Sequence, residues 1–220
     1  MVRMSDRVAR SEQVAATRET ILLTAERLFA EHGVAGVSNR QISQEAGQGN
    51  NTAVSYHFGS KEGLVRAIVR QHTEQIEGAR GRMVARIDGS DEVRDWVACT
   101  VEPLALHLEE LGSPSWYGRF SAQVLADPAY REIAASEALD SPSLARAGEE
   151  LHRCLPDLPT EVRLERQAMT RQLIVHTIAE RERAVAAGNS TSWSSWPQTA
   201  VGLTDALTGL WTAPVTRVLV

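Results

Sequence analysis

Apolar residues recur at three- and four-residue spacing along most of this chain, and that spacing is the feature that most limits its fold. It is clear from residue 14 onwards, where Ile21, Ala25 and Phe29 share one face of a helix. No segment alternates apolar and polar residues for long enough to form a sheet strand. The sequence therefore predicts an all-α fold.

The N-terminal part of the chain carries start and stop signals for three helices. The first helix is expected to end at Gly33, because glycine tolerates the left-handed backbone that commonly follows a helix. Ser38 and Gln41 fit a capping box at the start of a second helix. Glycines within residues 47–49 break that helix, and a short third helix is expected over about residues 51–58. This arrangement is typical of a helix-turn-helix.

These signals divide the chain into three segments. Residues 1–13 are expected to form a flexible basic arm, because they hold three arginines and little apolar surface. Residues 14–62 are expected to form a three-helix DNA-binding domain with a helix-turn-helix. Residues 63–220 are expected to form a larger C-terminal helical domain, and a loop near residues 88–91 looks like a boundary between domains. Its helices are expected at residues 92–111, 115–126, 143–154, 161–187 and 198–211.

Charge and composition narrow the class of protein. The net charge is −5, but residues 1–70 carry nine Lys or Arg against seven Asp or Glu, and residues 71–220 carry 14 against 21. The small basic excess is therefore N-terminal. No apolar run approaches the ~18 residues of a membrane span, and the N-terminus lacks a signal-peptide core. With only Cys99 and Cys154, the chain is expected to be cytoplasmic, with reduced thiols and no membrane partner.

Polar side chains gather at the start of the second helix and around the third. Amides and hydroxyls at the N-terminal end of a recognition helix suit base edges in the major groove, and the groups that follow suit phosphates. The expected DNA-binding residues are Arg40, Asn50, Asn51, Thr52, Ser55, Tyr56, His57 and Lys61. For any single Asn or Thr in this set, a turn or capping role explains the residue equally well.

The run from Thr20 to Gly33, followed by Ile42, Ala46-Gly47 and the Tyr-His-Phe-Gly-Ser-Lys-Glu of residues 56–62, resembles the tetracycline-repressor (TetR) family. The resemblance covers about residues 14–70. It implies a homodimeric repressor that binds a palindromic, double-stranded operator DNA. It also implies that the C-terminal domain dimerises and binds an unidentified small-molecule effector, which releases the DNA.

The same resemblance assigns roles by position. It implies that Arg40 and residues 50–55 face base pairs, while Tyr56, His57 and Lys61 contact the DNA backbone. The turn before Tyr56 is one residue longer than the commonest pattern of the family. The positions assigned to base contacts can therefore shift by one residue.

Two further sets of residues are expected to serve the C-terminal domain. The effector pocket, for a largely apolar molecule, is assigned to Trp96, His107, Trp116, Phe120, Met169 and His176, although the same residue types also build ordinary helix cores. The last two helices hold more apolar surface than one core face needs, which predicts a four-helix dimer interface. That interface is assigned to Leu173, Leu203, Leu207, Leu210 and Trp211, with Leu207 and Leu210 near its centre.

Other classes of protein find less support in the sequence. A metal site at His152 and Cys154, with Cys99 or His107, is disfavoured because His-x-Cys places its two ligands on different helix faces. No cofactor and no metal are therefore expected. The chain contains no nucleophile elbow, phosphate-binding loop or zinc-protease motif, so an enzyme is not expected. A helical ligand-binding protein without DNA contact remains the alternative.

Overall fold

The computed structural model describes residues 2–50, 52–189 and 195–216, with side chains from residue 11 onwards. Ten helices and no strand occur within these ranges, which confirms the all-α fold. The helices are α1 (Val2–His32), α2 (Asn39–Glu45), α3 (Ala53–Phe58), α4 (Lys61–Arg86), α5 (Val93–Leu111), α6 (Tyr117–Ala126), α7 (Pro128–Leu139), α8 (Pro142–Cys154), α9 (Thr160–Ala186) and α10 (Trp196–Thr212).

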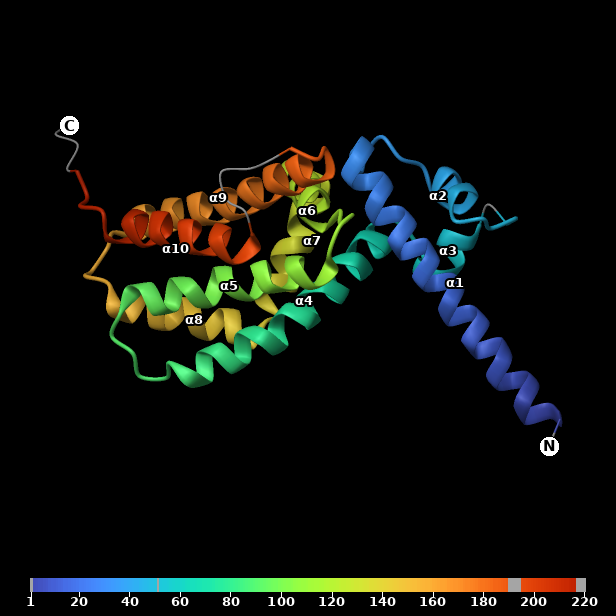
Figure 1. Ribbon diagram of the computed structural model, residues 1–220, viewed down its shortest axis with the longest axis horizontal. Coiled ribbons are helices and arrows are strands. Elements are labelled where there is room, and N and C mark those ends of the chain that lie inside the picture. The colour runs from blue at the N-terminus through green and yellow to red at the C-terminus, as the bar shows by residue number, and fades with distance from the viewer. Residues whose placement is uncertain (1, 51, 190–194, 217–220) are drawn as a thin grey trace.

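Helices α1, α2 and α3, together with the start of α4, form a small N-terminal domain that we call the head. In Figure 1 the head lies at one end of the molecule, with α2 and α3 on the same side of α1. Its core contains Phe29, Ile42, Val54 and Leu64, each with a relative exposure of 0%. These side chains come from all four helices, so burying them fixes the helix-turn-helix against α1.

The basic arm expected at residues 1–13 is instead the beginning of α1, which starts at Val2. This part of α1 extends away from the rest of the head (Figure 1). Residues 11–16 are exposed, so no packed core holds it in place. The helix continues there because residues such as Ala15, Gln13 and Glu12 favour helix, and adding a turn to an existing helix is easier than starting one. The first helix therefore begins earlier than expected, and the flexibility of residues 1–13 stays a prediction.

Helices α4 to α10 form the larger domain, and α4 connects it to the head (Figure 1). Helix α5 is central, because it packs against α4, α8 and α10. Helix α6 packs against both α9 and α1, so it also contacts the head. Helix α7 was not expected from the sequence. It begins at Pro128, and the Asp127 carboxylate accepts a hydrogen bond of 2.9 Å from the Ala129 N–H.

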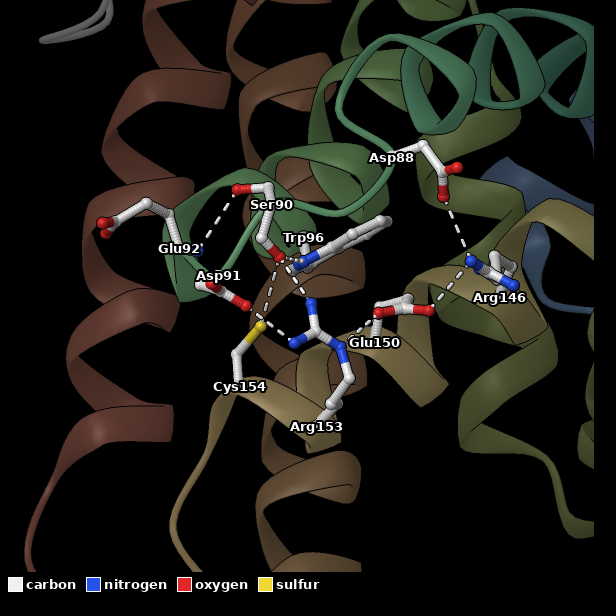
Figure 2. Close-up of polar contacts among 9 residues, drawn as sticks. All are labelled: Asp88, Ser90, Asp91, Glu92, Trp96, Arg146, Glu150, Arg153 and Cys154. Atoms are coloured by element: carbon white, nitrogen blue, oxygen red, sulfur yellow. Dashed lines mark hydrogen bonds and ion pairs between the residues drawn. The ribbon is translucent and has the colours of Figure 1, made fainter.

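The loop between α4 and α5 is fixed onto α8, so it is not a boundary between domains as the sequence suggested. Figure 2 shows the contacts. Arg153 of α8 donates hydrogen bonds to the Asp91 carboxylate at 2.7 Å and to the Ser90 carbonyl at 2.8 Å. The Trp96 indole donates to the same carbonyl at 2.9 Å. Arg153 also donates to the Glu150 carboxylate at 2.7 Å, and its hydrogen bonds to Asp91 and Glu150 raise the pKa of Arg153.

Helix α10 differs from its expected role as the centre of a dimer interface. Leu203, Leu207 and Trp211 are 5%, 0% and 3% exposed in the single chain, because this face of α10 covers α5. Their assignment to the interface was therefore wrong: a partner subunit would not reach these side chains. Leu210 is half-buried, and Leu173 of α9 is exposed.

A further finding is that no helix in the described ranges has the length and apolarity needed to cross a bilayer.

Candidate nucleic-acid interface

The capping box at the start of α2 is present and sets the direction of the helix. The Gln41 N–H donates to the Ser38 hydroxyl at 3.2 Å, and the Ser38 N–H donates to the Gln41 side-chain carbonyl at 2.8 Å. The helix ends at Glu45, and Gly47 follows with a φ of +67°. Because a side chain would strain that backbone, glycine permits the short turn towards α3.

Helix α3 buries one face and exposes the other. Ala53 and Val54 pack into the head, whereas Ser55 is exposed and Tyr56 is 77% exposed. Just before the helix, the Asn50 side-chain carbonyl accepts hydrogen bonds from the Thr52 N–H at 2.9 Å and the Thr52 hydroxyl at 2.7 Å. This local bonding orders the turn in front of α3 and leaves the Asn50 amide N–H groups available to a partner.

A close approach between α3 and α4 fixes the orientation of α3. The Ser60 hydroxyl accepts a hydrogen bond of 3.1 Å from the Gly63 N–H and so caps α4. A Cβ atom on Gly63 would overlap the carbonyl oxygen of Phe58. Only glycine therefore lets the end of α3 lie so near the first turn of α4. Our sequence analysis missed this role, although a glycine in the first turn of an apolar-patterned helix was a usable signal.

Arg40 and Lys61, the two cationic side chains expected to bind DNA, differ in whether they already make hydrogen bonds within the protein. Arg40 is exposed and makes no hydrogen bond or ion pair with any residue that the structure describes. The Lys61 ammonium is half-buried and donates to the Val34 carbonyl at 3.1 Å. Lys61 therefore tethers α4 to the turn after α1, and only its remaining N–H groups are available to a phosphate.

Those of the expected DNA-binding residues that the structure describes lie on α2, in the turn before α3, on α3 and at the start of α4. Five of them are exposed: Arg40, Asn50, Thr52, Ser55 and Tyr56. His57 and Lys61 are half-buried, and the His57 ring packs edge-on against Tyr56 with centroids 4.9 Å apart. Asn51 lies outside the described residues. Their contacts with DNA stay a prediction.

A chain of buried polar side chains joins the head to the larger domain. His72 of α4 lies 3.1 Å from a carboxylate oxygen of Glu26 on α1 and 2.7 Å from the His107 ring on α5. Tyr117 of α6 stacks on His72, with ring centroids 3.9 Å apart. All four side chains are buried. We call this set the junction cluster. Sequence analysis missed it because its members are far apart along the chain.

Burial controls the ionisation of His107 in the junction cluster. Desolvation, with a smaller effect from His72, lowers the pKa of His107 from 6.5 to about 4. His107 is therefore neutral near pH 7, and one imidazole N–H is available for the hydrogen bond with His72.

A cavity of about 190 Å³ lies within the larger domain, among helices α4 to α9. None of the six residues expected to line an effector pocket lines it. Trp96 and Phe120 are fully buried in the core, and His107 belongs to the junction cluster. Trp116 is half-buried, and Met169 and His176 are exposed. Large aromatic side chains fill the core, so smaller side chains line much of the space that is left. The assignment of the six residues to an effector pocket stays a prediction.

His152 and Cys154, the residues of the disfavoured metal site, make other contacts in the structure. The His152 ring packs against Trp211 with centroids 5.6 Å apart, and the Cys154 thiol lies 3.6 Å from the Ser90 carbonyl oxygen. Within the described part of the chain, no group of three or more His, Cys, Asp or Glu side chains is arranged to hold a metal ion.

Comparison with known proteins gives two family matches. Residues 21–68 match the tetR family of bacterial regulatory proteins, and residues 98–209 match a tetracycline-repressor-like C-terminal domain. The HTH-type transcriptional repressor AcnR of Corynebacterium diphtheriae is 25% identical over 164 residues, covering 70% of this chain and 77% of that protein. AcnR of Corynebacterium glutamicum is 35% identical over 69 residues, which cover 31% of this chain and only 36% of that protein.

A solved structure shows the same fold. It is that of a tetR-family transcription regulator from Shewanella sp. PV-4, with a TM-score of 0.61 and 18% identity. The likeness covers 91% of this chain and 99% of the other. The shared architecture therefore includes both the head and the larger domain.

Proposed function

Because the chain belongs to the tetR family of bacterial regulatory proteins, a family of DNA-binding transcription regulators, we propose that it is a cytoplasmic repressor released from its operator by a small molecule. In this proposal a homodimer binds a palindromic operator, and the small molecule enters the cavity of the larger domain. The curated relatives are named as transcriptional repressors, which supports repression over activation.

The exposed face of α3 is the observation that carries the DNA-binding proposal. Tyr56 is 77% exposed, and Ser55 beside it is also exposed, on a helix whose other face is buried. A helix of six residues held against α2 by a glycine turn is small enough to enter a major groove about 12 Å wide. Arg40 supplies an uncommitted guanidinium from α2, which suits a guanine edge or a phosphate.

The dimer is proposed to form through the exposed side of α9, adjoined by the end of α10. Met169, Leu173 and His176 are exposed and share one face of α9 by their four- and three-residue spacing. Arg171 and Val175, which line the cavity, occupy the opposite face. Exposed apolar groups on one side of a long helix are suited to a symmetric pairing. Two heads would then read two half-sites.

Tyr117 supports the proposed release of DNA by an effector. The residue lines the cavity, and its ring stacks on His72 of the junction cluster. His72 in turn contacts Glu26 of α1, the helix on which α2 and α3 are mounted. A molecule that displaces Tyr117 would therefore disturb the attachment of the head. Release requires that the molecule bind the DNA-free arrangement more tightly.

Duplex binding tests the proposed function. Fluorescence anisotropy would measure the affinity of the purified protein for DNA flanking its own gene, at low and moderate salt. We expect a complex of one dimer per duplex that weakens steeply with salt, because contacts to phosphates release counterions. Arg40→Ala should weaken binding, whereas Arg82→Ala, an exposed arginine near the far end of α4, should not.

The alternative of a helical ligand-binding protein predicts a different outcome. In that case neither specific nor salt-dependent duplex binding would be observed, and Arg40→Ala would behave as the parent protein does. Affinity that stays flat between the two salt concentrations would also contradict the proposal, since contacts to phosphate cannot be independent of salt.

A further inference from the structure

We propose that the cavity binds a small apolar molecule with a single negative charge, such as a short aliphatic or single-ring aromatic monocarboxylate, held by Arg80 and Arg171. This inference rests on the proposed function, which makes the cavity the effector site. It adds the chemical class of the effector, which the comparisons with known proteins leave open.

The size and lining of the cavity define the apolar part of the ligand. The volume is about 190 Å³, whereas pockets for drug-sized ligands commonly have about 300–1,000 Å³. Most of the lining is aliphatic, with Val69, Ile76, Leu104, Val124 and Val175 among its residues. A ligand that fills this space must therefore be small and largely hydrocarbon.

The charges around the cavity define the polar part of the ligand. Of the fifteen residues found to line it, two are arginines and none is acidic. Arg80 comes from α4 and is 6% exposed, and Arg171 comes from α9 and is exposed. Two cations beside an apolar space favour an anion and oppose a cation, because Coulomb interactions strengthen where water is excluded.

Arg80 has hydrogen-bonding capacity that the protein does not use. Its Nε donates to the Cys99 carbonyl at 3.1 Å, and its Nη1 donates to the Ser141 hydroxyl at 3.3 Å. Its Nη2 has no acceptor among the residues that the structure describes. Burial lowers the pKa of Arg80, which reflects the cost of holding a cation there. An anion in the cavity would supply the missing acceptor.

The acidic residue nearest to Arg80 is already committed elsewhere. One carboxylate oxygen of Glu77 lies 3.6 Å from Arg80, outside ordinary hydrogen-bond distance. The same carboxylate accepts hydrogen bonds from the Ser143 N–H at 2.8 Å, from the Ser143 hydroxyl at 2.7 Å and from the Ser141 hydroxyl. Glu77 therefore caps the start of α8 and neutralises Arg80 only in part.

Arg171 supplies the second cation from the solvent side. It makes no hydrogen bond or ion pair with any described residue, although it lines the cavity. An unpaired, exposed guanidinium can move towards a bound carboxylate without breaking an existing contact. The carboxylate would thus be bound between a buried and an exposed arginine, while its hydrocarbon part occupies the aliphatic lining.

Matched small molecules test this inference directly. Isothermal titration calorimetry would compare hexanoate, hexan-1-ol and hexylamine, and separately benzoate, benzyl alcohol and benzylamine, binding to the intact protein. At least one acid should bind about tenfold or more tightly than its alcohol, as charge-assisted hydrogen bonds imply, and the amine should not bind. Arg171→Gln should remove most of that preference, whereas Arg82→Gln should leave it unchanged.

A second variant locates the site and protects the test against misfolding. Ala138→Phe would fill the cavity from α7 and should abolish binding of acid and alcohol alike. The inference is overturned if the alcohol or amine binds as tightly as the acid, if Arg171→Gln keeps the preference, if Ala138→Phe still binds the acid, or if no acid binds. An unchanged preference in Arg171→Gln would mean that only the hydrocarbon stem of Arg171 covers the cavity.

Duplex binding by the same samples separates this inference from the proposed function. If the acid binds but leaves DNA affinity unchanged, the ligand class stands and the effector part of the proposed function is wrong. If DNA binding is salt-dependent but no acid binds, the repressor stands and the ligand class is wrong. Both are supported if the acid lowers DNA affinity in the parent protein and not in Arg171→Gln.

Discussion

Acid should destabilise this protein through His107 before most of its carboxylates are protonated. The pKa of His107 is 6.5 in an ordinary environment and about 4 in the folded protein. As the pH falls through this range, the unfolded chain binds a proton that the folded protein excludes. The stability due to neutral His107 is therefore complete above about pH 6.5 and is lost progressively towards about pH 4.

The size of the effect follows from the shift in pKa. One pKa unit corresponds to about 1.4 kcal/mol, so the full shift corresponds to about 3 kcal/mol. About 2 kcal/mol of this should be lost between about pH 7.5 and about pH 5. The side chains that face His107 are His72 and Tyr117, with Glu26 beyond His72. The predicted loss of stability between these two pH values comes from His107 alone, so replacing His107 must make the free energy of unfolding depend less on pH.

Urea unfolding at the two pH values, at one fixed protein concentration, measures how much the free energy of unfolding changes with pH. We expect His107→Asn, which keeps a hydrogen-bonding side chain but does not titrate, to lose about 2 kcal/mol less stability than the parent protein over this range. His32→Asn, at an exposed position on α1, is the control and should behave as the parent does. An equal loss in His107→Asn and the parent would refute the reasoning.

Three further substitutions, the first with a matched control, test the structure at separate positions. Gly63→Ala should lower DNA affinity because its Cβ would collide with the Phe58 carbonyl. Gly81→Ala is the control on the same helix: its Cβ would meet no neighbouring side chain or other helix, so it should keep DNA affinity and raise stability by about 0.5–1 kcal/mol. Equal DNA affinities of the two variants would contradict this. Glu182→Gln should lower the free energy of unfolding by about 2–4 kcal/mol in urea unfolding. The reason is that the buried carboxylate accepts hydrogen bonds from the Gly118 and Arg119 N–H groups and from the Arg119 side chain. An unchanged free energy of unfolding would mean that these contacts are replaced by water. Leu207→Ala should cost about 2–5 kcal/mol as a core cavity, and sedimentation showing stable, folded monomers instead would return Leu207 to the dimer interface.

Local signals were read correctly where neighbouring residues determine the structure. The Ser38–Gln41 capping box and the left-handed glycine at position 33 are present. Both depend on backbone groups within a few residues, so the sequence contains what is needed to predict them. Helix α7 was missed because no helix was expected between residues 126 and 143, although proline in the first turn after an Asp cap, here Pro128 after Asp127, starts a helix.

Long-range features were not predictable in the same way. An amphipathic helix shows that one face is buried but not against what, so Leu207 was assigned to a partner subunit and in fact packs within its own chain. The junction cluster joins residues 26, 72 and 107, whose proximity only the folded chain reveals. None of the residues assigned to an effector pocket lines the cavity for a related reason, because aromatic type alone does not distinguish a filled core position such as Phe120 from a residue that lines an open space.

Selection of duplexes from a random DNA library by the purified protein tests the central claim most directly. The account predicts enrichment of an inverted repeat whose half-sites are separated by about one helical turn, because two α3 helices related by a two-fold axis must read equivalent sequences. Tyr56→Ala protein should fail to enrich the same repeat, since that variant removes the most exposed aromatic side chain of α3. Recovery of no shared sequence, or of the same inverted repeat by Tyr56→Ala with unchanged affinity, would contradict the assignment of α3 as the DNA-reading helix.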